Sequence, residues 1–134
     1  MITVKEFREL LLKCNSDWNV RLGKWEHENP FKKKNPIYPL PSRVSVSIQD
    51  IMYRKTDDGD VIYKIILVDD FDDKFEMPRD MMIKLFCGKK NDSDLLDFVL
   101  YIEDTPGHYN HVPLNVEVGD FGYSDKVMGI EFFE

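Results

Sequence analysis

His108 and His111 are the two residues whose type and spacing come closest to a metal-binding motif. A zinc site needs three or four His, Cys or carboxylate ligands that converge on the ion at about 2 Å. The two histidines directly follow the turn sequence Thr105-Pro106-Gly107, and no E-x-x-H or C-x-x-C sequence accompanies them. We interpret them as solvated turn histidines, and the sequence predicts no metal ion and no cofactor.

A run of carboxylates lies between residues 69 and 73, and hard oxygen ligands of this kind suit Ca²⁺. An EF-hand loop that began at Asp70 would need an acidic or amide ligand at its fifth position and glycine at its sixth. Lys74 and Phe75 occupy those positions, which excludes such a loop. We therefore expect an acidic surface that docks a basic partner. Its candidate residues are Asp57, Asp58, Asp60, Asp69, Asp70, Asp72 and Asp73.

Residues 120–122 read Asp-Phe-Gly, the triplet that holds a metal ion in protein kinases. The chain has no glycine-rich loop and no H-R-D sequence, and it is far too short for a kinase, so the match is a coincidence. It also has no Walker sequence, no G-x-G-x-x-G and no G-x-S-x-G. Because no set of acid, base and nucleophile converges in the sequence, we predict that the protein is not an enzyme.

The strongest functional signal is a basic, proline-rich segment at residues 23–42. Proline fixes φ and cannot donate to a strand ladder, so the segment predicts a long loop, and loops of this length are often functional. Lysines can neutralise phosphates and aromatic rings can stack on bases, but three lysines in an acidic protein are a small footprint. We expect a protein partner here and no direct binding to nucleic acid. The candidate contact residues are Trp25, Phe31, Lys32, Lys33, Lys34 and Tyr38.

Charge is divided unevenly along the chain. Residues 1–55 contain 11 Lys/Arg and 6 Asp/Glu, whereas residues 56–134 contain 7 Lys/Arg and 19 Asp/Glu. The net charges of the two parts are therefore +5 and −12. This division predicts opposite potentials on different surfaces of the folded protein, which would guide its association with a macromolecule.

Two helices are predicted from apolar residues that recur at spacings of three and four. The first covers residues 3–14 and begins with a T-x-x-E capping box formed by Thr3 and Glu6. The second begins near Pro78 and ends near Gly88, a natural C-cap. Alternation of apolar and polar residues predicts strands at residues 18–22, 44–48, 61–68, 97–102, 112–118 and 127–133.

The order helix, strand, strand, strand occurs twice, in residues 1–70 and again in residues 75–134. The offsets between the two copies are not constant, so the internal duplication is left open. We expect the chain to form a single domain of the α+β class, with an antiparallel sheet that carries both helices on one face. If the repeat is real, two like helix–strand–hairpin units share one core.

The composition fits a globular protein, because 43% of the residues are hydrophobic and 13% are aromatic. Cys14 and Cys87 each fall late in a predicted helix, and we expect two buried thiols in a reducing compartment. A disulfide between them would require Cα atoms within about 7 Å. No signal peptide and no run long enough to span a membrane is visible, so we expect a cytoplasmic protein without a membrane partner.

The opening sequence Thr3-Val4-Lys5-Glu6-Phe7, with Leu11, Asp17 and Val20 after it, resembles the start of many short uncharacterised proteins of bacteria, phages and mobile elements. Residues 116–120 and 125–130 are similar to the way such proteins end. The resemblance covers about a third of the chain. It implies a small α+β unit of phage or mobile-element origin in a bacterial host cell, but no chemistry and no functional residue. Residues 23–42 depart from the pattern, and we expect this segment to have acquired its own partner.

Together these observations predict a non-enzymatic interaction protein that binds and inhibits a host nucleic-acid-handling or defence protein. Its clustered carboxylates would occupy a site that normally holds phosphates, and the basic aromatic loop would form a second contact. The alternative is an oligomeric module that binds a small ligand or nucleotide, for example one that sequesters a signalling nucleotide. A mass that rises with concentration and falls with salt would favour the alternative.

Overall fold

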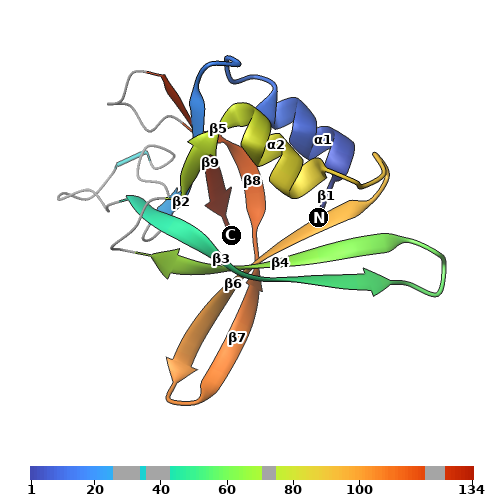
Figure 1. The fold of residues 1–134 in the computed structure, drawn as a ribbon. Helices are drawn as coiled ribbons and strands as arrows, with labels where there is room; N and C mark the ends of the chain where they lie inside the picture. Colours follow the sequence, from blue (N-terminus) through green and yellow to red (C-terminus); the bar gives the residue numbers. More distant parts are fainter. Residues whose placement is uncertain (26–33, 36–42, 71–74, 120–125) are drawn as a thin grey trace.

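The computed structural model describes residues 1–25, 34–35, 43–70, 75–119 and 126–134 (Figure 1). Its helices are α1 (Val4–Leu11) and α2 (Arg79–Cys87). Its strands are β1 (Ile2–Thr3), β2 (Asn19–Trp25), β3 (Arg43–Lys55), β4 (Val61–Asp70), β5 (Glu76–Pro78), β6 (Leu95–Thr105), β7 (His108–Pro113), β8 (Asn115–Gly119) and β9 (Val127–Phe133). Among the described residues, no helix combines the length and the apolar character needed to cross a membrane.

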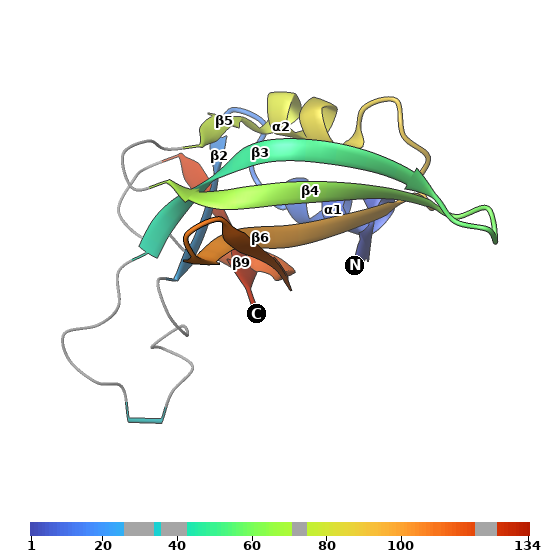
Figure 2. The same cartoon turned by 90° about the horizontal axis from the view of Figure 1, so that it is seen from below.

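The strands form one sheet that curls on itself. Neighbouring strands follow the order β1-β6-β4-β3-β2-β9-β8, while β5 pairs with β2 and β7 pairs with β6. Because β7 continues through Leu114 into β8, the path of neighbouring strands returns to β6. The two helices lie together on one side of this sheet, and the hairpins β3–β4 and β6–β7 project from it in different directions (Figures 1 and 2).

The predicted α+β class is confirmed, but the sheet is mixed rather than antiparallel. Strand β2 runs parallel to β9, and β4 runs parallel to β6. Both parallel pairs join strands that are separated by a helix or by most of the chain. Alternation along a strand reveals which side chains face the core, but it does not reveal the direction of the neighbouring strand. The sequence therefore could not specify these two pairings.

The strand pairings fall into corresponding sets. Strand β2 follows α1 and pairs with β5 and β9, whereas β6 follows α2 and pairs with β1 and β4. The antiparallel pair β3–β4 corresponds in the same way to β8–β9, and β2–β3 corresponds to β6–β7. A duplicated unit would produce this pattern. The duplication of residues 1–70 as residues 75–134 stays a prediction from the sequence.

The predicted capping box begins α1. Thr3 Oγ1 accepts a hydrogen bond from the Glu6 N–H at 3.1 Å, and the Glu6 carboxylate accepts one from the Thr3 N–H at 3.1 Å. Both orphan amides are thereby satisfied, which is why the helix begins at Val4. The hydrogen bonds from Thr3 lower the pKa of the Glu6 carboxyl below its ordinary value of 4.5.

This capping box makes stability depend on pH in a predictable direction. Because the pKa of Glu6 is lower in the folded state, its contribution is fully present above pH 4.5 and is lost as the pH falls through the folded pKa. We expect wild type to be more stable than Glu6→Gln at about pH 7, and the difference to shrink as the pH approaches about 3. Urea unfolding at both values measures this. A difference that is equal at the two values would contradict the assignment.

Aromatic rings from both helices and two strands form the centre of the core. The ring of Phe98 on β6 lies 5.2 Å from Phe7, 5.9 Å from Phe86 and 4.8 Å from Phe132, measured between ring centroids. Phe7 of α1 and Phe86 of α2 also meet edge to face at 5.4 Å. All four side chains are fully buried. Helices and sheet therefore share one apolar core.

The two cysteines are buried, as the sequence predicts, and no disulfide joins them. Cys87 packs in the core cluster beneath α1, and its thiol lies 3.8 Å from the Val4 carbonyl oxygen. Burial raises the pKa of both thiols above the ordinary value. A protonated, enclosed thiol is a poor nucleophile, so both cysteines have a structural role in packing.

Candidate functional site

The basic loop lies mostly outside the described residues. This applies to Phe31, Lys32, Lys33 and Tyr38, and also to Asp72 and Asp73 of the acidic run. The start of the predicted loop is wrong, because residues 23–25 belong to β2, where Trp25 pairs with Arg43 of β3. Lys34 is exposed.

The described carboxylates of the predicted acidic surface do not lie together. Asp57, Asp58 and Asp60 are exposed in the turn between β3 and β4, while Asp69 and Asp70 are the last residues of β4 and not of a loop. A strand rises about 3.3 Å per residue, so about 30 Å of β4 separates the two groups. Figure 2 shows the turn projecting far from the other end of the strand. These carboxylates therefore do not form one contiguous surface, and their role in binding a partner stays a prediction.

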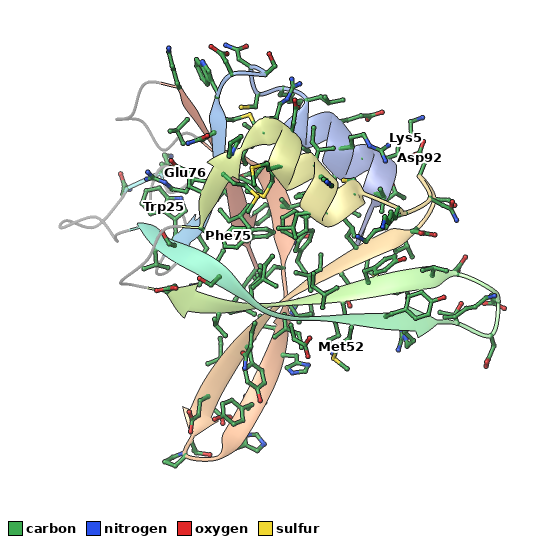
Figure 3. The ribbon with its side chains drawn as sticks, in the orientation of Figure 1. Lys5, Trp25, Met52, Phe75, Glu76 and Asp92 are labelled. Atoms are coloured by element: carbon green, nitrogen blue, oxygen red, sulfur yellow. The ribbon has the colours of Figure 1, made fainter. Side chains whose placement is uncertain are left out.

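Charges from the two parts of the chain form ion pairs with one another in the folded protein. The ion pairs Arg8–Asp92, Arg21–Glu76 and Lys24–Asp69 have N–O distances of 2.6, 2.9 and 3.4 Å. Each joins a basic residue of residues 1–55 to an acidic residue of residues 56–134. Figure 3 likewise shows Lys5 and Asp92 side by side, joined by a backbone hydrogen bond. The predicted separation of opposite charges onto different surfaces does not hold for these residues.

A different group of side chains comes together on the sheet face turned away from the core. Register places Lys64 of β4 opposite Met52 of β3, and Tyr101 of β6 opposite His111 of β7. Asp97 and Tyr101 alternate along β6 with the core residues Phe98 and Leu100. Their register partners Lys64 and His111 therefore also lie on the face opposite to the core. Figure 3 shows Met52 pointing away from the two helices. We call this group the outer cluster: Met52, Lys64, Tyr101, Tyr109 and His111.

Close contacts hold the outer cluster in one arrangement. The rings of Tyr101 and Tyr109 are stacked, with centroids 4.4 Å apart and planes 8° from parallel. Tyr101 also contacts the ring of His111 at 5.2 Å. Lys64 Nζ lies 2.9 Å from His111 Nδ1. An ammonium group can only donate, so His111 Nδ1 is the acceptor in this contact.

Carboxylates surround the aromatic rings. Asp97 lies opposite Lys64 in the ladder, and Glu103 lies opposite Tyr109. The negative charge of Glu103 raises the pKa of the Tyr109 hydroxyl. Asp104 lies 2.7 Å from the His108 ring and accepts a hydrogen bond from Asn110 at 2.8 Å, and these contacts, that with His108 above all, lower its pKa. Asp97 and Glu103 therefore border the outer cluster, whereas Asp104 binds Asn110 on the opposite face of the hairpin.

Beneath the rings, the same face has an apolar floor. Ile66 and Val99 are register partners on β4 and β6, and they are only 7% and 3% exposed. Met52 and Tyr109 above this floor remain 49% and 45% exposed. Partly exposed aromatic and apolar side chains over an apolar floor are typical of surfaces that bind another molecule.

The histidines have a different setting from the one predicted. His108 and His111 are exposed, but both belong to strand β7 rather than to a turn. Within the described ranges, no group of three or more His, Cys, Asp or Glu side chains could hold a metal ion.

Comparison with known proteins gives no indication of the function of this chain. No family matches. A scan against protein-family models finds none that fits the chain, and neither a curated protein nor a solved structure is significantly similar to it. The resemblance of residues 3–20 to phage and mobile-element proteins stays a prediction.

The outer cluster could not be recognised because residues 105–111 resemble a turn in the sequence, and the apolar alternation predicts that the next strand begins at residue 112. The structure begins β7 at His108 and ends it at Pro113. The sequence does contain a signal for this hairpin. Tyr101 and Glu103 precede the turn, while Tyr109 and His111 follow it, each pair two residues apart. Alternation of this kind on both sides of Pro-Gly is typical of a hairpin with one aromatic face.

Proposed function

We propose that this chain is a non-enzymatic interaction protein, and that its outer cluster binds an arginine-rich segment of another protein. The observation that carries the proposal is the stacked pair of half-buried Tyr101 and exposed Tyr109, with Glu103 opposite Tyr109 in the ladder. Stacked rings held by a rigid sheet lose little conformational freedom when a partner binds, which favours recognition over a flexible contact.

The charge around the cluster supports a basic partner. The carboxylates of Asp50, Asp97 and Glu103 lie on this face and outnumber its cations, Lys64 and Arg54. Lys64 already shares its hydrogen bond with His111. The whole chain has a net charge of −7. A negative, aromatic surface attracts cations and repels phosphate groups, so the surface favours a basic protein segment over nucleic acid.

Arginine fits this surface better than lysine. Its planar guanidinium can stack on the Tyr109 ring while it donates paired hydrogen bonds to a carboxylate such as Glu103. Such a contact contributes about 0.5–1 kcal/mol at an exposed site, so several arginines are needed for stable binding. Proteins that handle nucleic acids use arginine to hold phosphates. A host protein of that class as the partner stays a prediction from the sequence.

The proposal is tested by titrating the protein with nona-arginine and nona-lysine at low salt, and following its backbone amide signals by NMR. We expect nona-arginine to bind more tightly, and Tyr109→Ser to weaken it about two- to fivefold, which is the loss of one exposed stacking contact. Met81→Ser removes an exposed apolar side chain from α2 and is the matched control. It should bind as wild type does.

Two results would contradict the proposal. One is equal binding of nona-arginine by wild type and Tyr109→Ser. The other is a nucleoside triphosphate that shifts the signals of Tyr101 and Tyr109 while nona-arginine leaves them in place. The second result would instead support the alternative of a module that binds a small ligand or nucleotide.

A further inference from the structure

The long strand β3 has one edge that is open over most of its length. Strand β2 pairs with β3 only at residues 43–45, whereas β4 pairs with the other edge as far as Lys55. In the part of the chain that the structure describes, no strand covers the open edge beyond residue 45. Figures 1 and 2 show this part of the β3–β4 hairpin projecting away from the rest of the molecule.

Hydrogen bonding at the turn determines which amides face the open edge. The Thr56 N–H donates to the Asp60 carbonyl at 2.8 Å, and the Gly59 N–H donates to the Thr56 carbonyl at 2.9 Å. Because hydrogen-bonded and non-hydrogen-bonded pairs alternate along an antiparallel ladder, Arg54 and Met52 direct their backbone groups toward β4. The N–H and C=O groups of Ile51 and Tyr53 therefore point toward the open edge. In agreement, the Ile51 N–H donates to its neighbour, the Asp50 carboxylate, at 2.8 Å.

The side chains of this edge are unusually apolar. Ile51, Met52 and Tyr53 are consecutive and are 40%, 49% and 62% exposed. An exposed apolar edge strand is a ready template for pairing with another strand, and proteins usually protect such an edge with charge or proline. Here the charges lie at the two ends of the apolar group, where Asp50 and Arg54 have opposite signs.

We propose that a second copy of this chain pairs with the open edge of β3 in antiparallel orientation, with Met52 opposite Met52 across a two-fold axis. In this register Ile51 of each copy lies opposite Tyr53 of the other. Asp50 of each copy likewise lies opposite Arg54 of the other. The strand is therefore complementary to itself in both shape and charge, which identifies a second copy as its partner.

Neighbouring registers lack this complementarity. A shift by one residue places backbone groups that face the open edge opposite groups that face β4, so the ladder cannot form. A shift by two residues preserves the hydrogen-bonding pattern of the ladder. In one direction, this shift places Asp50 opposite Met52. In the other direction, Ile51 lies opposite Lys55 and Met52 opposite Arg54. Both lose the two ion pairs.

Pairing replaces each hydrogen bond of the isolated edge. The Ile51 N–H leaves the Asp50 carboxylate and donates to the Tyr53 carbonyl of the second copy, and the Tyr53 N–H donates to the Ile51 carbonyl in return. The freed Asp50 carboxylate then accepts from Arg54 across the interface. Since the two-fold axis is perpendicular to the sheet, both outer clusters lie on the same side of the joined sheet. The pairing does not depend on the function proposed for that cluster.

Charge exchange at the two positions provides a sharp test. We expect the mass of wild type, measured by light scattering up to about 1 mM protein, to rise from 15.8 kDa toward twice that value. Asp50→Arg alone places arginine opposite arginine, and Arg54→Asp alone places aspartate opposite aspartate, so each variant should stay monomeric. The double variant Asp50→Arg/Arg54→Asp restores opposite charges and should dimerise again.

Far-UV circular dichroism and thermal unfolding verify that each variant is folded. Leu12→Ser, an exposed apolar position at the end of α1, is the matched control and should dimerise as wild type does. The proposal is overturned if wild type keeps a mass of 15.8 kDa over the whole range. It is also overturned if either single variant dimerises as well as wild type, or if the double variant does not recover.

Discussion

Replacing Phe98 with alanine is expected to lower the free energy of unfolding by about 3–5 kcal/mol. The Phe98 side chain is 1% exposed and contacts rings from α1, α2 and β9. Its removal leaves a cavity where both helices meet the sheet, and three neighbouring rings cannot collapse into it together. Urea unfolding monitored by circular dichroism measures the loss.

Leu12→Ala is the control for this substitution, because Leu12 is 50% exposed and an exposed substitution changes stability by about 0.5 kcal/mol or less. Phe98→Leu keeps most of the volume and should lose less than Phe98→Ala. A loss below about 1 kcal/mol for Phe98→Ala would mean that the helices and the sheet do not share one core.

The second large effect is expected at Gly88, which ends α2. A Cβ atom at this position would lie 2.4 Å from the Lys84 carbonyl oxygen, and that oxygen belongs to rigid helical backbone. Overpacking against backbone costs about 1–3 kcal/mol, so Gly88→Ala should destabilise the protein by about 2 kcal/mol. Urea unfolding of wild type and Gly88→Ala compares the two free energies.

Lys89→Gly distinguishes this explanation from an ordinary glycine C-cap. Gly88 has φ of −66°, and the left-handed conformation belongs to Lys89, with φ of 59°. Left-handed backbone costs a residue with a side chain about 1–2 kcal/mol, and glycine loses about half of that advantage as backbone entropy. Lys89→Gly should therefore stabilise the protein slightly. If it destabilised the protein, Gly88 would have to be the left-handed cap after all.

Features that depend on a few neighbouring residues could be predicted from the sequence. The capping box needs only Thr3 and Glu6, and both of its hydrogen bonds are present. The turn at Gly59 needs only a residue that tolerates positive φ, and Gly59 has φ of 87°. Such features are encoded within four or five residues, so distant parts of the chain cannot change them.

Strand length was harder to predict where the alternation changes phase. The sequence predicts a strand that ends at Ile48, whereas β3 continues to Lys55. The register shifts between Ile48 and Asp50, which is the position of a β-bulge. A bulge inserts one residue and exchanges the two faces of the strand, so the alternation beyond it no longer continues the pattern before it. The exposed apolar part of the open edge of β3, Ile51 to Tyr53, lies directly after this irregularity.

The uneven division of charge along the sequence did not predict where the charges lie in the folded protein, and the reason is again pairing between distant residues. A division of charge along the sequence becomes a division of surfaces only if each part of the chain folds by itself. Here β2 lies between β3 and β9 and also pairs with β5, so the two parts alternate in space. The basic Arg21 therefore meets the acidic Glu76 at 2.9 Å. Long-range pairing, which composition does not reveal, determines where each charge lies.

The most direct test of the proposed function is a map of the amide signals that nona-arginine shifts in wild type. We expect the shifts to concentrate on β6 and β7 from Tyr101 to His111 and on Lys64 of β4, and to diminish at high salt, where exposed charges are screened. Shifts confined to the helices, or to the turn at Asp57–Asp60, would contradict it. In that case the outer cluster would not be the surface by which this protein recognises its partner.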